Sequence, residues 1–412
     1  MTVSAVVWAD TAGVTDALER LRGAVTVVRR CDELTEIVAL AESGLADAAL
    51  LAGDPLDVDA ATLDSLARLG VPALVLTDDG AATERLAGLG ASVESPSAPA
   101  QSISDLLELL CGGAVRGRMP TPAAGPPVQR EPWEDRAPGR ITAVWGPPGS
   151  SGRTTVAVNM AVEAALDGKN VVLVDADTYG ASVAVHLGLL DESAGLAQLC
   201  RLADQGVLDR SGFERGCSVL AVAGARLRVA TGLPRPSRWP ELRAESMARV
   251  LDFARRQSDL VVVDVAPAIE FDEDLSFDTS APQRNAATAA ALEAADEVLA
   301  VGAADSVGVP RLVKAVEELG DRFPDIEPRI VFNKVRSASI GASPERQLRE
   351  TWARFGPDRP VAAFLPWDPE AADGALLAGS PLAESAPASG LRTSVAGLVG
   401  VGIPRRKSLF RR

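Results

Sequence analysis

The 412-residue chain is 47% hydrophobic and 24% charged, with a formal net charge of −15. This is the composition of globular domains, and the length allows two to three of them. No apolar run approaches the ~20 residues of a membrane helix, and the acidic balance argues against nucleic acid as a partner.

Residues 1–111 alternate short apolar strands with helices. The predicted strands are Val3–Trp8, Val25–Arg29, Ala48–Leu51 and Ala73–Leu76. The predicted helices are Val14–Arg22, Glu33–Glu42, Ala60–Leu69, Ala82–Gly88 and Ile103–Leu110. This rhythm predicts a doubly wound parallel sheet. The segment holds 6 basic and 18 acidic residues, a net charge of −12, so we expect it to be repelled by nucleic acid and by anionic membranes.

This segment resembles a response-regulator receiver domain, a flavodoxin-like fold. The resemblance places the phospho-acceptor aspartate at the end of the third strand, where this chain has Ala52. The lysine expected after the fifth strand is also missing from the segment 92–96, and Asp10 alone does not make an acidic pocket. We therefore predict a degenerate receiver-like domain for docking or dimerisation, which cannot be phosphorylated. An unrelated flavodoxin-like domain is the alternative.

Residues 112–139 are predicted to form a linker between two domains. The stretch from Gly112 to Arg140 contains six prolines and five glycines, a composition typical of linkers. A flexible coil of this length spans roughly 30 Å.

The segment that follows reads as a phosphate-binding loop. Ile141–Trp145 is predicted as a strand and Thr154–Leu166 as a helix with one apolar side. The loop between them leaves backbone N–H groups at the start of the helix, where the helix dipole also favours phosphate. Thr154 holds the position of the hydroxyl that reaches Mg²⁺. The predicted nucleotide-binding residues of this segment are Gly149, Ser150, Ser151, Gly152, Arg153, Thr154 and Thr155.

The loop departs from the pattern G-x-x-x-x-G-K-[ST] at two positions. Pro147 replaces the first glycine, and Arg153 replaces the lysine. Arginine keeps the positive charge, but its wide planar fork is not equivalent to an ammonium group. A glycine-rich turn without a ligand is the alternative interpretation.

Aspartates follow two further apolar runs. Asn170–Val174 leads to Asp175 and Asp177, and Leu260–Val263 leads to Asp264. Ligands of open α/β sheets bind at the carboxyl ends of the strands, and Asp264 fits the Walker-B carboxylate that holds Mg²⁺. We assign Asp175 to the metal as well, and Asp177, with Arg153, to a catalytic role. Turn or capping aspartates are the alternative.

From residue 140 to 403 the chain resembles the MinD/ParA group of P-loop ATPases with a deviant Walker A loop. The stretches that carry the resemblance are 171–177, 180–182, 186–189, 295–301, 331–335 and 365–368. The resemblance implies a doubly wound parallel sheet, ATP and Mg²⁺ as cofactors, and a homodimer. It also implies that Asn333 contacts adenine and that Pro366 lies near the base.

Within the group, the N-terminal extension and the Gly-Arg-Thr-Thr loop look most like the CpaE/TadZ branch, and more narrowly an actinobacterial CpaE-like or septum-site-determining-like subset. That branch is associated with placing pilus or secretion machinery at cell poles. The group's signature lysine falls on Pro148 and its second lysine on Arg153. The resemblance therefore implies weak, slow or lost ATP hydrolysis. Arg238 and Arg284 are free basic residues that could replace the missing cation.

The remaining segments are less informative. Leu196–Ala203 and Glu241–Arg256 are predicted as helices, and Ser218–Ala223 as a strand. The acidic stretch 270–274 is either a nucleotide-ordered switch or a solvated loop. His186 is predicted to be structural.

The two ends and the cysteines bear on location. The N-terminus lacks the pattern of a signal peptide, and the four scattered cysteines have no metal-ligand spacing, so reduced thiols in a cytoplasmic protein are expected. Residues 404–412 form a basic tail, which is either solvated or makes weak peripheral contact with anionic lipid.

Two functions compete. The first is a nucleotide-gated localisation or assembly factor, with partners in pilus, secretion or septum-site machinery, placed at a pole or at the inner face of the membrane. The second is an ATPase that cycles in division or partitioning, which would need the cross-dimer lysine that Pro148 replaces. A pseudo-ATPase that binds neither nucleotide nor metal is a third reading, because proline removes backbone donors.

Overall fold

The computed structural model describes residues 3–10, 13–21, 23–112, 137–189, 194–270 and 282–402. Within these ranges the chain forms two compact units, each built around its own sheet. Most of the predicted linker 112–139, the basic tail 404–412 and the acidic stretch after Glu270 lie outside the described residues.

The N-terminal unit is a five-stranded sheet in the order β2-β1-β3-β4-β5, with every neighbouring pair parallel. Its strands are β1 (Val3–Trp8), β2 (Val25–Cys31), β3 (Ala48–Leu51), β4 (Ala73–Leu76) and β5 (Ser92–Glu94). Its α-helices are α1 (Val14–Leu21), α2 (Leu34–Glu42), α3 (Ala60–Arg68), α4 (Gly80–Gly88) and α5 (Ala100–Cys111). A short 3₁₀ turn, η1 (Pro55–Asp57), precedes α3. This order is one of the two common doubly wound arrangements.

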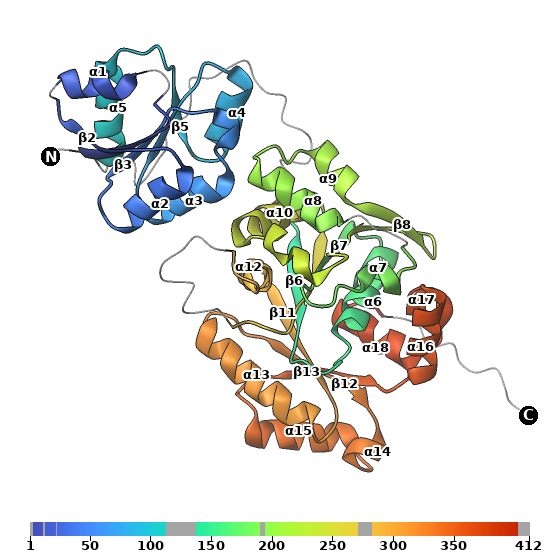
Figure 1. Ribbon diagram of the computed structural model, residues 1–412. Helices are drawn as coiled ribbons and strands as arrows, with labels where there is room; N and C mark the ends of the chain where they lie inside the picture. Colours follow the sequence, from blue (N-terminus) through green and yellow to red (C-terminus); the bar gives the residue numbers. More distant parts are fainter. Residues whose placement is uncertain are drawn as a thin grey trace, which may run out of the picture. The chain divides into compact units, whose positions relative to one another are not determined.

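Helices cover both faces of this sheet (Figure 1). The apolar residues of α1 and α5 pack with Val3, Ala5 and Val7 of β1, and those of α2, α3 and α4 pack with Val6 and Trp8 on the opposite face. Alternate residues of one strand thus enter two different cores, which explains why the strands read as continuous apolar runs.

The carboxyl edge of this sheet, where a receiver domain would have its phosphorylation site, is occupied by residues with structural roles. Ala52 is buried directly after β3. The ring of Trp8 fills the space beyond it, because a Cβ atom on Gly53 would lie 2.6 Å from that ring. The Asp10 carboxylate accepts backbone hydrogen bonds from Val14 at 2.8 Å and Thr15 at 3.0 Å, at the start of α1. The position at which a phospho-acceptor would be expected thus holds a buried alanine in apolar, filled surroundings.

The C-terminal unit is an eight-stranded sheet in the order β13-β12-β11-β6-β10-β7-β9-β8. Its strands are β6 (Arg140–Trp145), β7 (Val171–Ala176), β8 (Ser218–Val222), β9 (Ala225–Ala230), β10 (Leu260–Val265), β11 (Glu297–Ala303), β12 (Arg329–Val335) and β13 (Val361–Pro366). All neighbouring pairs are parallel except β8 with β9. The predicted α/β class with a doubly wound parallel sheet is confirmed for this unit.

Two layers of helices enclose this sheet (Figure 1). On one side lie α6 (Arg153–Leu166), α16 (Pro369–Ala378), α17 (Leu382–Ser385) and α18 (Gly390–Leu398). On the other side lie α10 (Ala244–Arg256), α12 (Ala286–Ala294), α13 (Gly308–Arg322) and α15 (Pro344–Phe355). The remaining helices are α7 (Val183–His186), α8 (Gly195–Asp204), α9 (Arg210–Gly216), η2 (Pro236–Glu241) and α14 (Ser337–Ile340).

The helix α6 is buried over most of its length. Residues 156–165 are buried without interruption, and they include Asn159 and Glu163. The Asn159 side chain accepts a hydrogen bond from the backbone N–H of Leu382 at 2.8 Å. Arg392 of α18 makes two hydrogen bonds to the Glu163 carboxylate, at 2.6 and 3.2 Å. These polar contacts fix the helix that follows the phosphate-binding loop to the C-terminal helices.

The strand predicted over Ser218–Ala223 is confirmed as β8, which is the first half of a hairpin with β9, a strand that was not predicted. The two turn residues, Ala223 and Gly224, both have positive φ, 46° and 92°, which is the geometry of a tight hairpin turn. The helix predicted over Glu241–Arg256 begins at Ala244 instead, after η2.

Candidate functional site

The loop between β6 and α6 has the backbone shape of an anion-binding turn. Gly149 and Gly152 have φ of 114° and 90°, and Ser150 has φ of 57°. Left-handed residues of this kind turn successive backbone amides toward one side. Gly152 cannot be replaced without disturbance, because a Cβ atom there would lie 2.3 Å from Nδ2 of Asn333. The loop therefore delivers N–H groups to the N-terminus of α6, where the helix dipole favours a phosphate.

Arg153 is folded back into this loop. Its Nη1 donates to the carbonyl oxygens of Gly146 at 3.3 Å and Pro147 at 3.1 Å, and its Nη2 lies 3.4 Å from Oδ2 of Asp177. The Arg153 side chain is only 13% exposed. The guanidinium thus supports the loop from inside, and its charge is shared with Asp177.

Thr154 and Asp264 meet directly below the loop. The Thr154 hydroxyl donates to Oδ2 of Asp264 at 2.6 Å, and Ser182 donates to the same hydroxyl at 3.4 Å. The other carboxylate oxygen of Asp264, Oδ1, is buried and has no hydrogen-bond partner within the described part of the chain. Burial, together with the charge of Asp175, raises the pKa of Asp264 well above its usual range. A buried, unpaired oxygen is costly, and a cation beside it would remove that cost.

Asp175 and Asp177 lie at the end of the neighbouring strand. Asp175 is the register partner of Asp264 across β7 and β10. It accepts backbone hydrogen bonds from Val183 and Asp177, and burial raises its pKa to about 7. One oxygen of Asp177 accepts the backbone N–H groups of Tyr179 and Gly180, both at 2.9 Å. The structure therefore brings the three predicted aspartates to one edge of the sheet.

These groups fit a Mg²⁺ ion that is shared with a nucleotide. Magnesium in such sites takes one or two protein oxygens and completes its shell with phosphate and water. Among the described residues no group of three or more His, Cys, Asp or Glu side chains could hold a metal without such help. Thr154 and Asp264 are therefore suited to a metal that arrives with phosphates.

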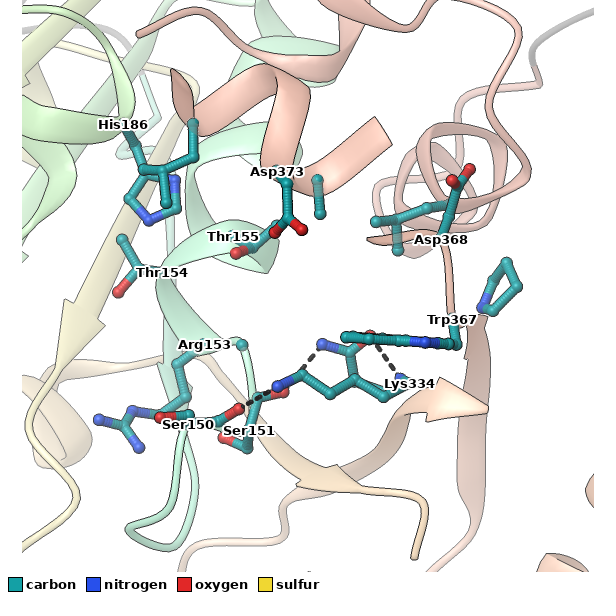
Figure 2. A pocket seen from close by; sticks show the side chains of 16 residues that line it. Ser150, Ser151, Arg153, Thr154, Thr155, His186, Lys334, Trp367, Asp368 and Asp373 are labelled. Carbon is teal, nitrogen blue, oxygen red and sulfur yellow. Dashed lines mark hydrogen bonds between the residues drawn. The ribbon is translucent and has the colours of Figure 1, made fainter. Parts of the chain in front are cut away.

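A cavity of about 400 Å³ opens above the loop (Figure 2). It joins the loop to the ends of β12 and β13 and to α16. Eight of the predicted nucleotide-binding residues line it: Ser150, Ser151, Gly152, Arg153, Thr154, Thr155, Asn333 and Pro366. Gly149 lines a smaller cavity of about 110 Å³ on the side of α13, together with Arg311.

The end of β12 holds the loop through two side chains. Nδ2 of Asn333 donates to the carbonyl oxygen of Ser151 at 2.8 Å, and Nζ of Lys334 donates to that of Ser150 at 2.6 Å. Figure 2 shows both contacts as dashed lines. Lys334 has φ of 60°, an unusual conformation for a residue with a side chain. Lys334 was not among the predicted site residues, because nothing in the local pattern shows that this lysine reaches back to the loop.

Neither of the two basic residues considered as substitutes for the loop lysine lines the cavity above the loop. Arg238 is not free, because both its Nε and its Nη2 donate to Glu241. The Arg284 guanidinium stacks on the ring of Tyr179, 4.1 Å from its centre. Tyr179 also donates through its hydroxyl to Asn285 at 2.9 Å. His186 lines the cavity above the loop, and burial lowers its pKa, so it is neutral at pH 7.

Comparison with known proteins agrees with this geometry. Residues 142–376 match the family described as the CobQ/CobB/MinD/ParA nucleotide binding domain. No curated protein matches the chain.

Solved structures share the fold of the C-terminal unit. The ParA family ATPase from Chlorobium tepidum TLS is 18% identical, with a TM-score of 0.52 over 63% of this chain and 98% of that one. The Pyrococcus furiosus cell division ATPase MinD is 19% identical, with a TM-score of 0.49 over 64% of this chain and 97% of that one. At 18% identity the likeness to the ParA family ATPase shows a shared fold and no more.

Proposed function

The chain belongs to the CobQ/CobB/MinD/ParA nucleotide-binding family, whose domain matches more than half of its length, and on that premise we propose that it binds ATP with Mg²⁺. The observation that carries the proposal is the 2.6 Å hydrogen bond from Thr154 to Asp264 at the N-terminus of α6. It places a hydroxyl and a carboxylate beside the amides that suit a phosphate.

Different residues of the site bind the phosphates, the metal and the nucleoside. The amides of the loop from Gly149 to Gly152 bind phosphate oxygens, and Thr154, with Asp264, holds the metal. Bound Mg²⁺ supplies positive charge against the phosphates. Asp175 lies next to Asp264 in the register of the sheet and would add negative charge at the metal side when it is ionised. Asn333 and Pro366 form the wall of the cavity at the nucleoside end.

We propose that turnover is slow or lost. Catalysis of phosphoryl transfer depends mainly on positioned positive charge. The Arg153 guanidinium is already engaged with two loop carbonyls and with Asp177. Asp177 in turn accepts two backbone hydrogen bonds and faces Arg153, so neither residue is poised to act on water. This favours binding as the functional event, with hydrolysis as a slow reset.

The biological role we propose is a nucleotide-gated localisation or assembly factor. A nucleotide at 100 times its dissociation constant favours the binding state by ~2.7 kcal/mol, which is enough to switch an interface. The C-terminal unit would dimerise with nucleotide, and the degenerate receiver-like unit would recruit a protein of a pilus, secretion or septum-site machine. Alanine has no side-chain oxygen that could be phosphorylated, so the buried Ala52 at the end of β3 supports recruitment that does not depend on phosphorylation.

Placement in the cell follows from this proposal. No helix within the described ranges is long and apolar enough to cross a membrane. We propose a protein of the cytoplasm that is brought to a pole or to the inner membrane face by its partners, with the basic residues 404–412 as an additional weak contact.

The test is calorimetric titration with ATP and Mg²⁺, combined with a phosphate-release assay on the same sample. Micromolar binding with little release supports the proposal, and Asp264→Ala should abolish the Mg²⁺-dependent part of the affinity. Asp252→Ala is the matched control, because Asp252 is exposed and its ion pair is with Arg256 on the same helix. Steady release that Asp264→Ala removes would favour a cycling ATPase, and no binding at millimolar ATP would refute the proposal.

A further inference from the structure

The phosphate-binding loop borders a second, smaller cavity on the side of α13. This cavity of about 110 Å³ is lined by loop residues and by residues from the end of β11 and the start of α13. Ser151 lines both this cavity and the one above the loop. Its hydroxyl oxygen is buried and has no hydrogen-bond partner among the described residues. Because buried polar atoms normally have a partner, an oxygen of a ligand that extends from one cavity to the other would satisfy it.

Arg311 of α13 brings a positive charge into the smaller cavity. Its Nη1 atom lies so close to Gly149 that a Cβ atom on this glycine would be 2.6 Å from it. Gly149 has φ of 114° and is the first left-handed residue of the loop after Gly146. The guanidinium therefore lies beside the beginning of the turn whose backbone amides suit a phosphate.

The guanidinium of Arg311 is not engaged with other parts of the protein. It has no hydrogen bond or ion pair among the described residues. The carboxylate in the same cavity, that of Asp305, accepts the backbone N–H groups of Val307 at 3.0 Å and Gly308 at 2.7 Å through one oxygen. Arg153, in contrast, donates to two carbonyl oxygens of the loop. Arg311 thus offers the loop a positive charge that no internal contact uses.

Packing fixes α13 beside the loop. Gly308 lies so close to β11 that a Cβ atom there would collide with the carbonyl oxygen of Ala303. Leu312, the residue after Arg311, is fully buried against Gly302 of β11, where a Cβ atom would lie 2.6 Å from its Cδ2. β11 pairs in turn with β6, the strand that leads into the loop. The same sheet therefore holds the loop and the backbone of Arg311, while the exposed Arg311 side chain can turn toward a ligand.

We propose that Arg311 binds the outermost phosphate of a nucleoside triphosphate, and that the protein distinguishes ATP from ADP through this contact. The inference rests on the proposed nucleotide binding and extends it to the phosphate that operates the switch. Asn333 and Pro366, at the nucleoside end, line the cavity above the loop, whereas Gly149 and Arg311 line the smaller one. A phosphate chain that starts in the first cavity reaches Arg311 with its last group, and a diphosphate ends before it.

A guanidinium suits this contact because its planar fork of donors matches two oxygens of one phosphate. It supplies from α13 the positive charge that the loop lacks, since Pro148 is uncharged and Arg153 is turned into the loop. The loop amides and the metal bind the inner phosphates of both nucleotides, so affinity for ADP does not depend on Arg311. Because Arg311 is exposed, added salt weakens its contact with the phosphate.

The experiment measures the dissociation constants of ATP and ADP with Mg²⁺ by calorimetry, for the full chain and its variants. Arg311→Met should weaken ATP binding by about 10- to 150-fold, the range for one hydrogen bond to a charged group, and leave ADP binding unchanged. Arg311→Glu should weaken ATP binding further, because a carboxylate repels the third phosphate. Lys314→Met and Lys314→Glu are the matched controls, since Lys314 is an exposed cation on the same helix that lines neither cavity.

The ratio of the two dissociation constants decides the inference. The wild type should bind ATP more tightly than ADP, and Arg311→Met should bind the two about equally. If the wild type binds neither nucleotide, the proposed function fails and the inference fails with it. If the wild type binds ATP but Arg311→Met keeps the wild-type ratio, or Lys314→Met lowers the ratio as much, only the inference is overturned.

Thermal unfolding without nucleotide excludes a structural explanation. Arg311→Met should melt at the wild-type temperature, because the guanidinium has no partner within the part of the chain that the structure describes. A variant that melts at this temperature, binds ADP normally and has lost its preference for ATP has lost the contact with the third phosphate. A variant that loses ADP and ATP binding in equal measure would show that Arg311 supports the loop as a whole, and would overturn its role in discrimination.

Discussion

Replacement of Asp264 by asparagine should make the protein more stable without nucleotide and unable to respond to it. Asparagine keeps an oxygen that can accept the hydrogen bond from Thr154, which is 2.6 Å long in the wild type. It removes a carboxylate that is 1% exposed, lies beside Asp175 in the register of the sheet, and has an unpartnered oxygen. Natural binding sites often hold such groups at the expense of stability.

The size of the effect follows from the loss of a buried charge, because asparagine still places a polar NH₂ group where the unpartnered oxygen lies. A charged group costs more to bury than a neutral one, and we take the difference as about 1–3 kcal/mol. One kcal/mol shifts the melting temperature of a unit of this size by about 2–4 °C. Asp264→Asn should therefore raise the melting temperature of the nucleotide-free protein by roughly 2–12 °C at pH 8. The stabilisation that saturating ATP and Mg²⁺ give the wild type, ~2.7 kcal/mol at 100 times the dissociation constant, should be lost.

The pH dependence tests the same reasoning. The folded protein holds the pKa of Asp175 at about 7, raised by burial from 3.8, and that of Asp264 is raised as well. Between pH 3.8 and about pH 7 the folded state binds more protons than the unfolded state, so the free energy of unfolding falls as the pH rises. Because Asp175 and Asp264 are buried side by side, they titrate as a pair, and we expect the pair to lower the free energy of unfolding by a few kcal/mol, at about 1.36 kcal/mol per pKa unit, as the pH rises from 4 to 7.

The assay is thermal unfolding of the wild type and Asp264→Asn from pH 5 to pH 8, each with and without ATP and Mg²⁺. The wild type without nucleotide should melt at a lower temperature at pH 8 than at pH 5, and the variant should show a shallower slope. A wild-type melting temperature that rises over this range, or a variant that is less stable than the wild type at pH 8, would refute the reasoning.

Three further predictions concern the loop and the helix behind it. Arg392→Met should lower the free energy of unfolding in denaturant by about 3–5 kcal/mol, because it leaves the buried Glu163 carboxylate without its ion-pair partner. Adding Glu163→Leu should recover most of this loss. A loss under about 1 kcal/mol in the single variant would contradict the prediction. Gly152→Ala should lower ATP affinity at least about tenfold by strain and a clash with Asn333, whereas Gly168→Ala, with φ of 89° and no neighbour within 4 Å, should leave affinity unchanged; equal effects of the two changes would disprove the steric argument. Arg153→Lys should speed phosphate release, since a lysine has one compact charge in place of the fork that now binds two carbonyls and Asp177; a rate no higher than that of the wild type would show that Arg153 does not limit turnover.

Local sequence determined the elements that carry the site. The glycines and serines from Gly149 to Gly152 lie between a strand and a helix, and short-range backbone preferences are enough to predict an anion-binding turn there. The positions of Asp175 and Asp264 were also predictable, because parallel strands that end in aspartate bring those residues to the same edge of the sheet. The alternation of strand and helix predicted the fold class, because strands joined by helices form a parallel sheet with helices on both faces.

The hairpin of β8 and β9 shows the limit of local reading. Leu227 and Val229 alternate with Arg226 and Arg228, a pattern of period two that indicates a strand. The two arginines hide it by lowering the hydrophobicity of the segment. Only pairing with β7 on one side and β8 on the other makes this segment a strand.

Only the tertiary structure decided how the charged residues are used. Lys334 lies 184 residues from Ser150 in the chain, yet its ammonium group holds that residue's carbonyl oxygen. Arg153 occupies the position of a phosphate-binding cation in the sequence, but its guanidinium turns into the loop and toward Asp177. A sequence gives the charge and its place along the chain. The partner of a long, flexible side chain depends on which distant backbone atoms packing brings within its reach, and that is fixed only when the whole sheet has formed.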